Sequence, residues 1–164
     1  MPVDRNTWLA LSDSELGALC LWDFHRTTGN GGQKKNKTSS AVRVTHKPTG
    51  ISAVCDGERS QKMNRREALQ KLRMALALNL REPPEAEIPA VLHTVLPSLA
   101  SPSYPLFAAF LLDIIASCGW DTEKAATLLQ WSKSRLFKVL GRDKKLGELV
   151  NRERLASGLT FLHF

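Results

Sequence analysis

Long hydrophobic runs are missing from this sequence of 164 residues. Its longest unbroken apolar stretch, residues 106–112, ends at Asp113, well short of the roughly 20 residues that a membrane-spanning helix needs. The first residues also lack the positively charged start and apolar centre of a secretory signal. We therefore expect no membrane association and a cytoplasmic protein.

Cysteine is scarce as well. The three cysteines, Cys20, Cys55 and Cys118, are widely spaced and contain no C-x-x-C pair, which argues against both a disulfide framework and a zinc site. We interpret them as reduced thiols in or near the core, and we predict neither a metal nor another cofactor. A G-x-S-x-G motif is absent too, so a serine hydrolase with that nucleophile turn is disfavoured.

Acidic residues are scarce in the first half of the chain. Residues 1–81 hold 14 Lys and Arg against 7 Asp and Glu, a net charge of +7, whereas residues 82–164 hold 9 of each kind. Within residues 26–73 the ratio is 12 to 3, which is typical of a protein that binds a polyanion such as nucleic acid. A solvated basic face that serves only solubility is the alternative.

Proline is concentrated in one segment. Six of the eight prolines lie in residues 82–105, where they exclude a long helix or a central strand. We therefore predict a domain at residues 10–81, a proline-rich linker at residues 82–105 and a helical module at residues 106–164. The predicted class is α+β, with a small mixed sheet and a packed helix in the first domain and only helices in the module.

Hydrophobic periodicity and turn residues predict the individual elements. In the first domain they predict a helix at residues 12–20, strands at 19–24, 40–46 and 51–55, a hairpin turn at 47–50, and a helix at 61–80 capped by Ser60. In the module they predict helices at residues 106–118, 121–130 and 132–140, the first ended by Gly119, the second capped by Asp121 or Thr122 and the third capped by Ser132.

Three glycines in four positions begin the segment GNGGQKKNK, residues 29–37. On its own, a Gly-Gly step is commonly only a turn. Here it belongs to a longer pattern of fixed spacings, formed by Gly29, Gly31, Gly32, Gln33, Asn36, Ser40, Ala41, Val42, Arg43, His46, Pro48, Thr49, Gly50, Ile51, Arg59, Ser60, Gln61, Asn64 and Ala68. This region resembles the GGQ domain of class I peptide chain release factors and of their short ribosome-rescue relatives.

The resemblance implies hydrolysis of the ester that joins a nascent peptide to tRNA, in the peptidyl transferase centre of the ribosome. It implies that Gly31, Gly32 and Gln33 are catalytic. The glycines would permit close approach of the backbone, the Gln33 N–H would stabilise the oxyanion, and the Gln33 side chain would position water. His25 and His46 lie outside this loop in the sequence, and we expect structural roles for them.

The implied partners are the ribosome, peptidyl-tRNA and ribosomal RNA. The family's glutamine is commonly methylated, so a glutamine methyltransferase that modifies Gln33 is a further expected partner. Phosphate contacts position a protein on RNA without reading its sequence. The candidates for such RNA contacts are Lys34, Lys35, Asn36, Lys37, Arg43, Arg59, Gln61, Arg65 and Arg66. The pair Lys34 and Lys35 is more basic than the residues that often follow the glutamine in this family, which affects the expected loop geometry but not the class.

Release factors that read stop codons carry further domains, for which 164 residues leave no room. We therefore expect codon-independent hydrolysis of the rescue type by a monomer. The rescue relatives commonly end in a flexible basic tail. In this chain, by contrast, residues 106–164 are predicted to be helical, and residues 82–164 carry no net charge.

The segment GWDTEKAATLLQWSKSRLFKVL, residues 119–140, resembles the helix-turn-helix of Fis-type DNA-binding proteins. The resemblance places Ala125, Ala126, Leu128 and Leu129 inward and leaves Lys133, Arg135 and Lys138 for nucleic-acid contacts. A small helical bundle that packs against the first domain or a protein partner is the alternative. A different hypothesis for the whole chain also follows, namely a non-catalytic nucleic-acid-binding regulator that acts through these helices.

Overall fold

A computed structural model of the chain describes residues 5–25, 40–84, 87–93 and 95–164. The protein is α+β, as predicted. Its contacts divide it into two compact units: the sheet unit, Thr7–Leu76, and the helical unit, Met1–Asn6 with Ala77–Phe164. The division falls inside α1 (Arg5–Ala10) and α3 (Gln61–Asn79), so each of these helices contributes residues to both units.

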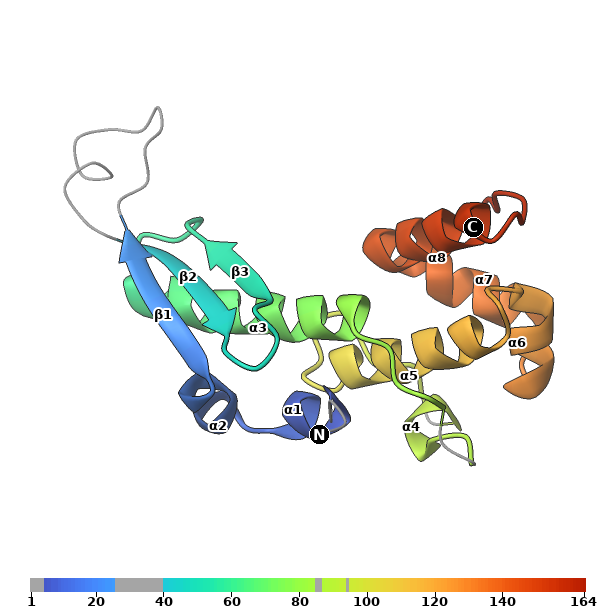
Figure 1. The fold of residues 1–164 in the computed structure, drawn as a ribbon, viewed down its shortest axis with the longest axis horizontal. Coiled ribbons are helices and arrows are strands. Elements are labelled where there is room, and N and C mark those ends of the chain that lie inside the picture. Colours follow the sequence, from blue (N-terminus) through green and yellow to red (C-terminus); the bar gives the residue numbers. More distant parts are fainter. Residues whose placement is uncertain (1–4, 26–39, 85–86, 94) are drawn as a thin grey trace. The chain divides into compact units, whose positions relative to one another are not determined.

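The sheet unit is built on three strands in the order β1 (Cys20–His25), β2 (Ala41–His46) and β3 (Ser52–Cys55), shown as arrows in Figure 1. Although the sequence predicts a mixed sheet, every pairing between these strands is antiparallel. The turn between β2 and β3 contains Gly50 at a φ of 71°, a left-handed conformation that glycine adopts without strain. The predicted hairpin is confirmed.

Helix α3 covers one face of this sheet (Figure 1) and contributes four buried apolar side chains to the core of the sheet unit. Its buried apolar residues within this unit recur at helical spacing and are Ala68, Leu69, Leu72 and Leu76. On β2, Val42 and Val44 are buried whereas Arg43 between them is exposed, because successive side chains of a strand point to opposite faces. Figure 1 shows α3 crossing behind the strands. Ser60 caps the helix as predicted, since its Oγ accepts the Met63 N–H at 3.4 Å.

The predicted short helix before β1 is α2 (Asp13–Ala18). Ser12 and Glu15 form a capping box: the Ser12 Oγ accepts the Glu15 N–H, and the Glu15 carboxylate accepts the Ser12 N–H at 2.9 Å. Arg73 of α3 is buried and donates to the carbonyls of Leu9 at 3.0 Å and Leu11 at 2.7 Å. This one side chain ties the segment between α1 and α2 to the core.

The helical unit adds α4 (Ala90–His93), α5 (Tyr104–Ser117), α6 (Thr122–Leu128), α7 (Lys133–Arg142) and α8 (Lys144–Ala156). Helices α5, α6 and α7 confirm the three predicted ones, whereas α1, α4 and α8 were not predicted. The caps of α6 and α7 are Asp121, which accepts the N–H groups of Glu123 and Lys124, and Ser132, which accepts that of Arg135 at 3.1 Å. Gly119, at a φ of 65°, follows the end of α5.

One inward position on α6 was predicted wrongly. Thr122, Ala125, Ala126 and Leu129 are buried and follow the i, i+3, i+4, i+7 spacing of a single helix face. Leu128 lies beside that face and is 49% exposed.

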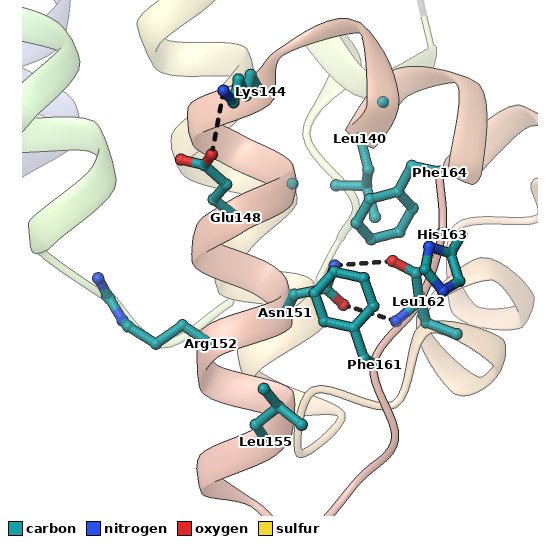
Figure 2. A pocket seen from close by; sticks show the side chains of 12 residues that line it. Leu140, Lys144, Glu148, Asn151, Arg152, Leu155, Phe161, Leu162, His163 and Phe164 are labelled. Carbon is teal, nitrogen blue, oxygen red and sulfur yellow. Dashed lines mark hydrogen bonds and ion pairs between the residues drawn. The ribbon is translucent and has the colours of Figure 1, made fainter.

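Helix α8 and the last residues of the chain pack together, as Figure 2 shows. The side-chain amide of Asn151 donates to the Leu162 carbonyl at 2.8 Å and accepts the Leu162 N–H at 2.9 Å. Gly147 lies inside the helix, where glycine costs about 1 kcal/mol relative to alanine. A Cβ at this position would meet the Leu140 carbonyl oxygen at 2.9 Å and the Phe164 ring at 3.1 Å, so close packing explains the glycine.

A buried carboxylate, Asp113 of α5, joins three segments of the helical unit. The guanidinium of Arg5 donates to both of its oxygens, at 2.9 Å to Oδ1, and also to the Leu80 carbonyl at 2.8 Å. The Glu82 N–H donates to Asp113 Oδ1 at 3.1 Å, and Arg81 lies 3.6 Å from the same oxygen. The Arg5 and Asp113 side chains are 0% and 2% exposed. Burial also lowers the pKa of Arg81.

Among the residues that the structure describes, no single helix combines the length and hydropathy needed to cross a membrane. Helices α5 and α6 pass that test only when taken together, and the chain bends by 116° between them.

Candidate functional site

The glycine-rich segment connects the two longest strands of the sheet. Strand β1 ends at His25 and β2 begins at Ala41, and these two residues are partners in the antiparallel register. The residues predicted to be catalytic, Gly31, Gly32 and Gln33, lie between them and outside the described residues, as do Lys34, Lys35, Asn36 and Lys37. The structure therefore describes the two strand ends, His25 and Ala41, that flank this segment.

Asn64 of α3 holds the backbone at the start of β2 in place by hydrogen bonds. Its Nδ2 donates to the carbonyl of Ser40, the residue before β2, at 2.7 Å and to the Glu58 carbonyl at 2.8 Å. Its Oδ1 accepts the Glu58 N–H at 2.9 Å, and the Cys55 thiol lies 3.5 Å from the same oxygen. Asn64 is fully buried. One side chain thus joins the start of β2, the end of β3 and the turn before α3.

Replacing Asn64 by alanine is expected to lower the free energy of unfolding by about 1–3 kcal/mol, because the buried Ser40 carbonyl and the half-buried backbone groups of Glu58 lose their partner. Urea unfolding followed by circular dichroism measures this loss. Asn64→Asp retains only the acceptor for the Glu58 N–H, so we expect it to rescue little. Gln70→Ala, at an exposed position of the same helix, serves as the control and should stay within about 0.5 kcal/mol of the wild type. Equal stability of Asn64→Ala and Gln70→Ala would contradict this role.

The remaining candidate RNA contacts of the sheet unit are exposed but do not share one face. Arg43 lies on the side of β2 away from α3, opposite Asp23 of β1 in the register. Arg59 lies in the turn before α3, and Gln61 is the first residue of that helix. Arg65 and Arg66 lie on α3 and line a groove with Trp22. The structure thus groups the last two and separates them from Arg43.

Two titratable side chains of the sheet unit, His46 and Cys20, are buried. His46 is buried, its Nδ1 lies 2.9 Å from the Thr49 hydroxyl, and its ring packs edge-on against Trp8 with centroids 4.5 Å apart. Burial lowers the pKa of His46 and so favours its neutral form. Burial likewise raises the pKa of the Cys20 thiol, which makes it a poor nucleophile at neutral pH. All three cysteines are free thiols.

The candidate contacts of the helical unit lie on α7. Lys133, Arg135 and Lys138 are all exposed. Lys133 forms an ion pair with Glu123 of α6, and the Arg135 guanidinium lies 4.3 Å from the centroid of the Trp131 ring. Within the described part of the chain, no group of three or more His, Cys, Asp or Glu side chains could hold a metal ion.

The structure places three further residues near the candidate contacts to which the sequence alone assigned no role, namely Asn64, Trp22 and Lys62. Asn64 belongs to the matched pattern, which was the available signal, but its hydrogen bonds depend on the packing of α3 against the sheet. Trp22 reads only as a strand residue, and Lys62 reads only as part of a basic helix. Their proximity to Arg65 and Arg66 is a property of the fold.

The sheet unit is a small antiparallel sheet with a long helix on one face and a glycine-rich connection between its first two strands. Comparison with known proteins shows which domain it resembles. Residues 17–91 match the family model of the RF-1 domain. This part of the chain is similar to RF-1 domains.

Curated relatives are similar to this chain over 65 to 74 residues. Peptide chain release factor 1 of Lachnoclostridium phytofermentans is 50% identical over 72 residues, which cover 43% of this chain and 20% of the relative. Peptide chain release factor 2 of Paramagnetospirillum magneticum is 46% identical over 74 residues, covering 45% and 19%. Peptide chain release factor 1 of Corynebacterium aurimucosum is 51% identical over 65 residues, covering 40% and 18%. The chain thus spans about a fifth of the length of these relatives.

Proposed function

We propose that this chain hydrolyses the ester between a nascent peptide and tRNA on the ribosome, as a protein of translation termination. The observation that carries the proposal is the match of residues 17–91 to the RF-1 domain, because this region includes the segment GNGGQKKNK. The names of the similar proteins, peptide chain release factors 1 and 2, support the same assignment.

In the proposed reaction, the oxygen of a water molecule bonds to the ester carbonyl carbon. The bond from that carbon to the tRNA ribose oxygen then breaks, and the proton given up by water ends on the ribose oxygen. The Gln33 N–H stabilises the negative charge that develops on the carbonyl oxygen, Gly31 and Gly32 let the backbone approach the ester, and the Gln33 side chain positions the water.

The proposed partners are the peptidyl transferase centre of the ribosome, peptidyl-tRNA and ribosomal RNA, in the cytoplasm. The exposed residues Arg43, Arg59 and Gln61, together with the basic residues after Gln33, contact RNA in this proposal. Methylation of Gln33 by a glutamine methyltransferase is part of the same proposal, and the protein acts as a monomer without a cofactor.

We further propose that hydrolysis is independent of the stop codon. The support is the resemblance of residues 29–68 to the GGQ domain that class I release factors share with their short ribosome-rescue relatives. The test compares peptide release from ribosomes whose A site holds a stop codon, a sense codon or no message. Similar rates in the three complexes are expected. Release only with a stop codon would contradict codon independence and leave the hydrolysis itself supported.

The helical unit is proposed to dock on nucleic acid through Lys133, Arg135 and Lys138. Changing all three to alanine is expected to make ribosome binding less sensitive to salt. With fewer phosphate contacts, binding releases fewer counterions, and the dependence of the affinity on salt concentration becomes shallower. Changing the exposed Lys124 of α6 with Lys144 and Lys145 of α8 is the matched control. An unchanged salt slope in the first variant would contradict docking. Preference for a duplex DNA site over ribosomes would instead favour a non-catalytic regulator.

A further inference from the structure

A groove opens on the sheet unit between α2, β1 and α3. It has a volume of about 620 Å³, and its lining includes Gly17 of α2, Trp22 of β1 and Lys62, Arg65 and Arg66 of α3. All three basic side chains are exposed, and the Trp22 ring is half-buried. The groove therefore combines an aromatic ring with three cations on one side of the sheet unit.

Trp22 and Arg65 form a cation–π contact in this groove. The indole Nε1 donates to the Gly17 carbonyl at 3.0 Å, which sets the orientation of the ring. The Arg65 guanidinium lies 4.4 Å from the ring centroid, within the range of a cation–π contact. Because the guanidinium is planar and the Arg65 side chain is exposed, another planar group can stack on it.

The three positive charges of the groove lack a carboxylate partner within the described part of the chain. Among the described residues, no carboxylate forms an ion pair with Lys62, Arg65 or Arg66, and Asp13, the acidic residue of the lining, is bound to Arg73 at 2.9 Å. Lys62 and Arg66 are separated by four residues on α3, a like-charge spacing that costs a helix a few tenths of a kcal/mol. By contrast, Lys124, Lys133, Lys144 and Arg152 of the helical unit all have carboxylate partners.

We propose that this groove binds a single-stranded stretch of RNA. The phosphates lie against Lys62 and Arg66, and one base stacks on the Arg65 guanidinium, which Trp22 supports from below. RNA bases commonly stack on aromatic rings and on arginine planes in this way. An acidic peptide would satisfy the charges but would leave the stacking face unused. The choice of RNA rests on the proposed function, which brings this domain to ribosomal RNA.

The test measures binding of a fluorescein-labelled oligouridylate of about 12 nucleotides, within the usual size range of single-strand sites, by anisotropy at several salt concentrations. Lys62→Ala with Arg66→Ala is expected to reduce the salt slope by about 1.4, which corresponds to two phosphate contacts on a single strand. Arg65→Lys keeps the charge but loses the planar stack, so its affinity is expected to fall about 5- to 150-fold. Its salt slope should stay that of the wild type.

The matched control is Lys71→Ala, which removes one positive charge from the same helix. Lys71 is exposed and lies nine positions after Lys62, half a turn around the helix, where its Nζ reaches the Val54 carbonyl of β3. It should bind RNA like the wild type. Weakening by Lys71→Ala equal to that of the groove variants, or wild-type affinity of Arg65→Lys, would overturn the proposal.

Peptide release by the wild-type chain, measured separately, distinguishes this inference from the proposed function. Release by a protein whose groove variants still bind RNA normally would overturn the groove alone. Loss of RNA binding in the groove variants of a protein that never releases peptide would support the groove as an RNA site and contradict the hydrolase.

Discussion

Replacing Gln33 by proline is expected to lower the rate of peptide release about 100- to 1000-fold, the usual effect of losing one oxyanion donor. Proline has no backbone N–H, so this change removes the proposed donor. Gln33→Ala keeps the N–H and removes only the side chain that positions water. We therefore expect a smaller loss of rate for Gln33→Ala, together with increased reaction of the ester with larger nucleophiles such as hydroxylamine.

The measurement is single-turnover release of labelled peptide from ribosomes saturated with each variant, so that binding does not limit the rate. Gly32→Ala tests the close approach of the backbone separately, because it adds a methyl group at a catalytic glycine while leaving the Gln33 N–H in place. Equal rates for Gln33→Pro and Gln33→Ala would show that the side chain, and not the N–H, carries the chemistry. Wild-type rates in all three variants would separate the motif from release altogether.

Replacing Asp113 by alanine is expected to lower the free energy of unfolding by about 3–5 kcal/mol, the typical cost of leaving a buried charge without its partner. Arg5 is fully buried and donates to both oxygens of this carboxylate, and the Glu82 N–H loses the same acceptor. Urea unfolding followed by circular dichroism gives the value. Asp23→Ala, at a side chain that is 66% exposed, is the control and should change stability by less than about 0.5 kcal/mol.

A double variant tests the cause of that loss. Arg5→Met with Asp113→Leu replaces the buried pair by apolar side chains, a change that is often neutral when the packing is retained. We expect this variant to recover most of the stability that Asp113→Ala loses. A loss for Asp113→Ala below about 1 kcal/mol, the range of exposed ion pairs, would mean that the buried charges contribute little.

Much of the fold could be predicted from local signals. The strands of the β2–β3 hairpin alternate buried and exposed residues on either side of a turn that ends in Gly50. The helices α3 and α7 begin after serine caps that the sequence contains. Such signals act over a few residues, so they do not depend on the rest of the chain.

The missed elements lack those signals or contain contrary ones. Helices α1 and α4 are short, with six and four residues, and proline precedes α4 closely. Helix α8 contains Gly147, which lowers helix propensity, and only its contacts with Leu140 and Phe164 explain the glycine. The pair of Arg5 and Asp113 joins residues 108 positions apart, a distance at which local patterns carry no information.

The candidate site divides in the same way. The Gly-Gly-Gln motif and its spacing are visible in the sequence, within the residues that match the RF-1 domain. The supporting role of Asn64 and the stack of Arg65 on Trp22 require the tertiary structure, because they join α3 to strands and turns that are distant in the chain.

Hydrolysis of the peptidyl-tRNA ester is tested most directly with purified ribosomes that carry labelled peptidyl-tRNA in the P site and a message that ends at that codon. The wild-type protein is added to these ribosomes, and the released peptide is measured. Release of the peptide well above the rate in buffer is expected, with each molecule of protein acting on more than one ribosome. Binding to these ribosomes with peptide release no faster than in buffer would contradict the proposed hydrolysis.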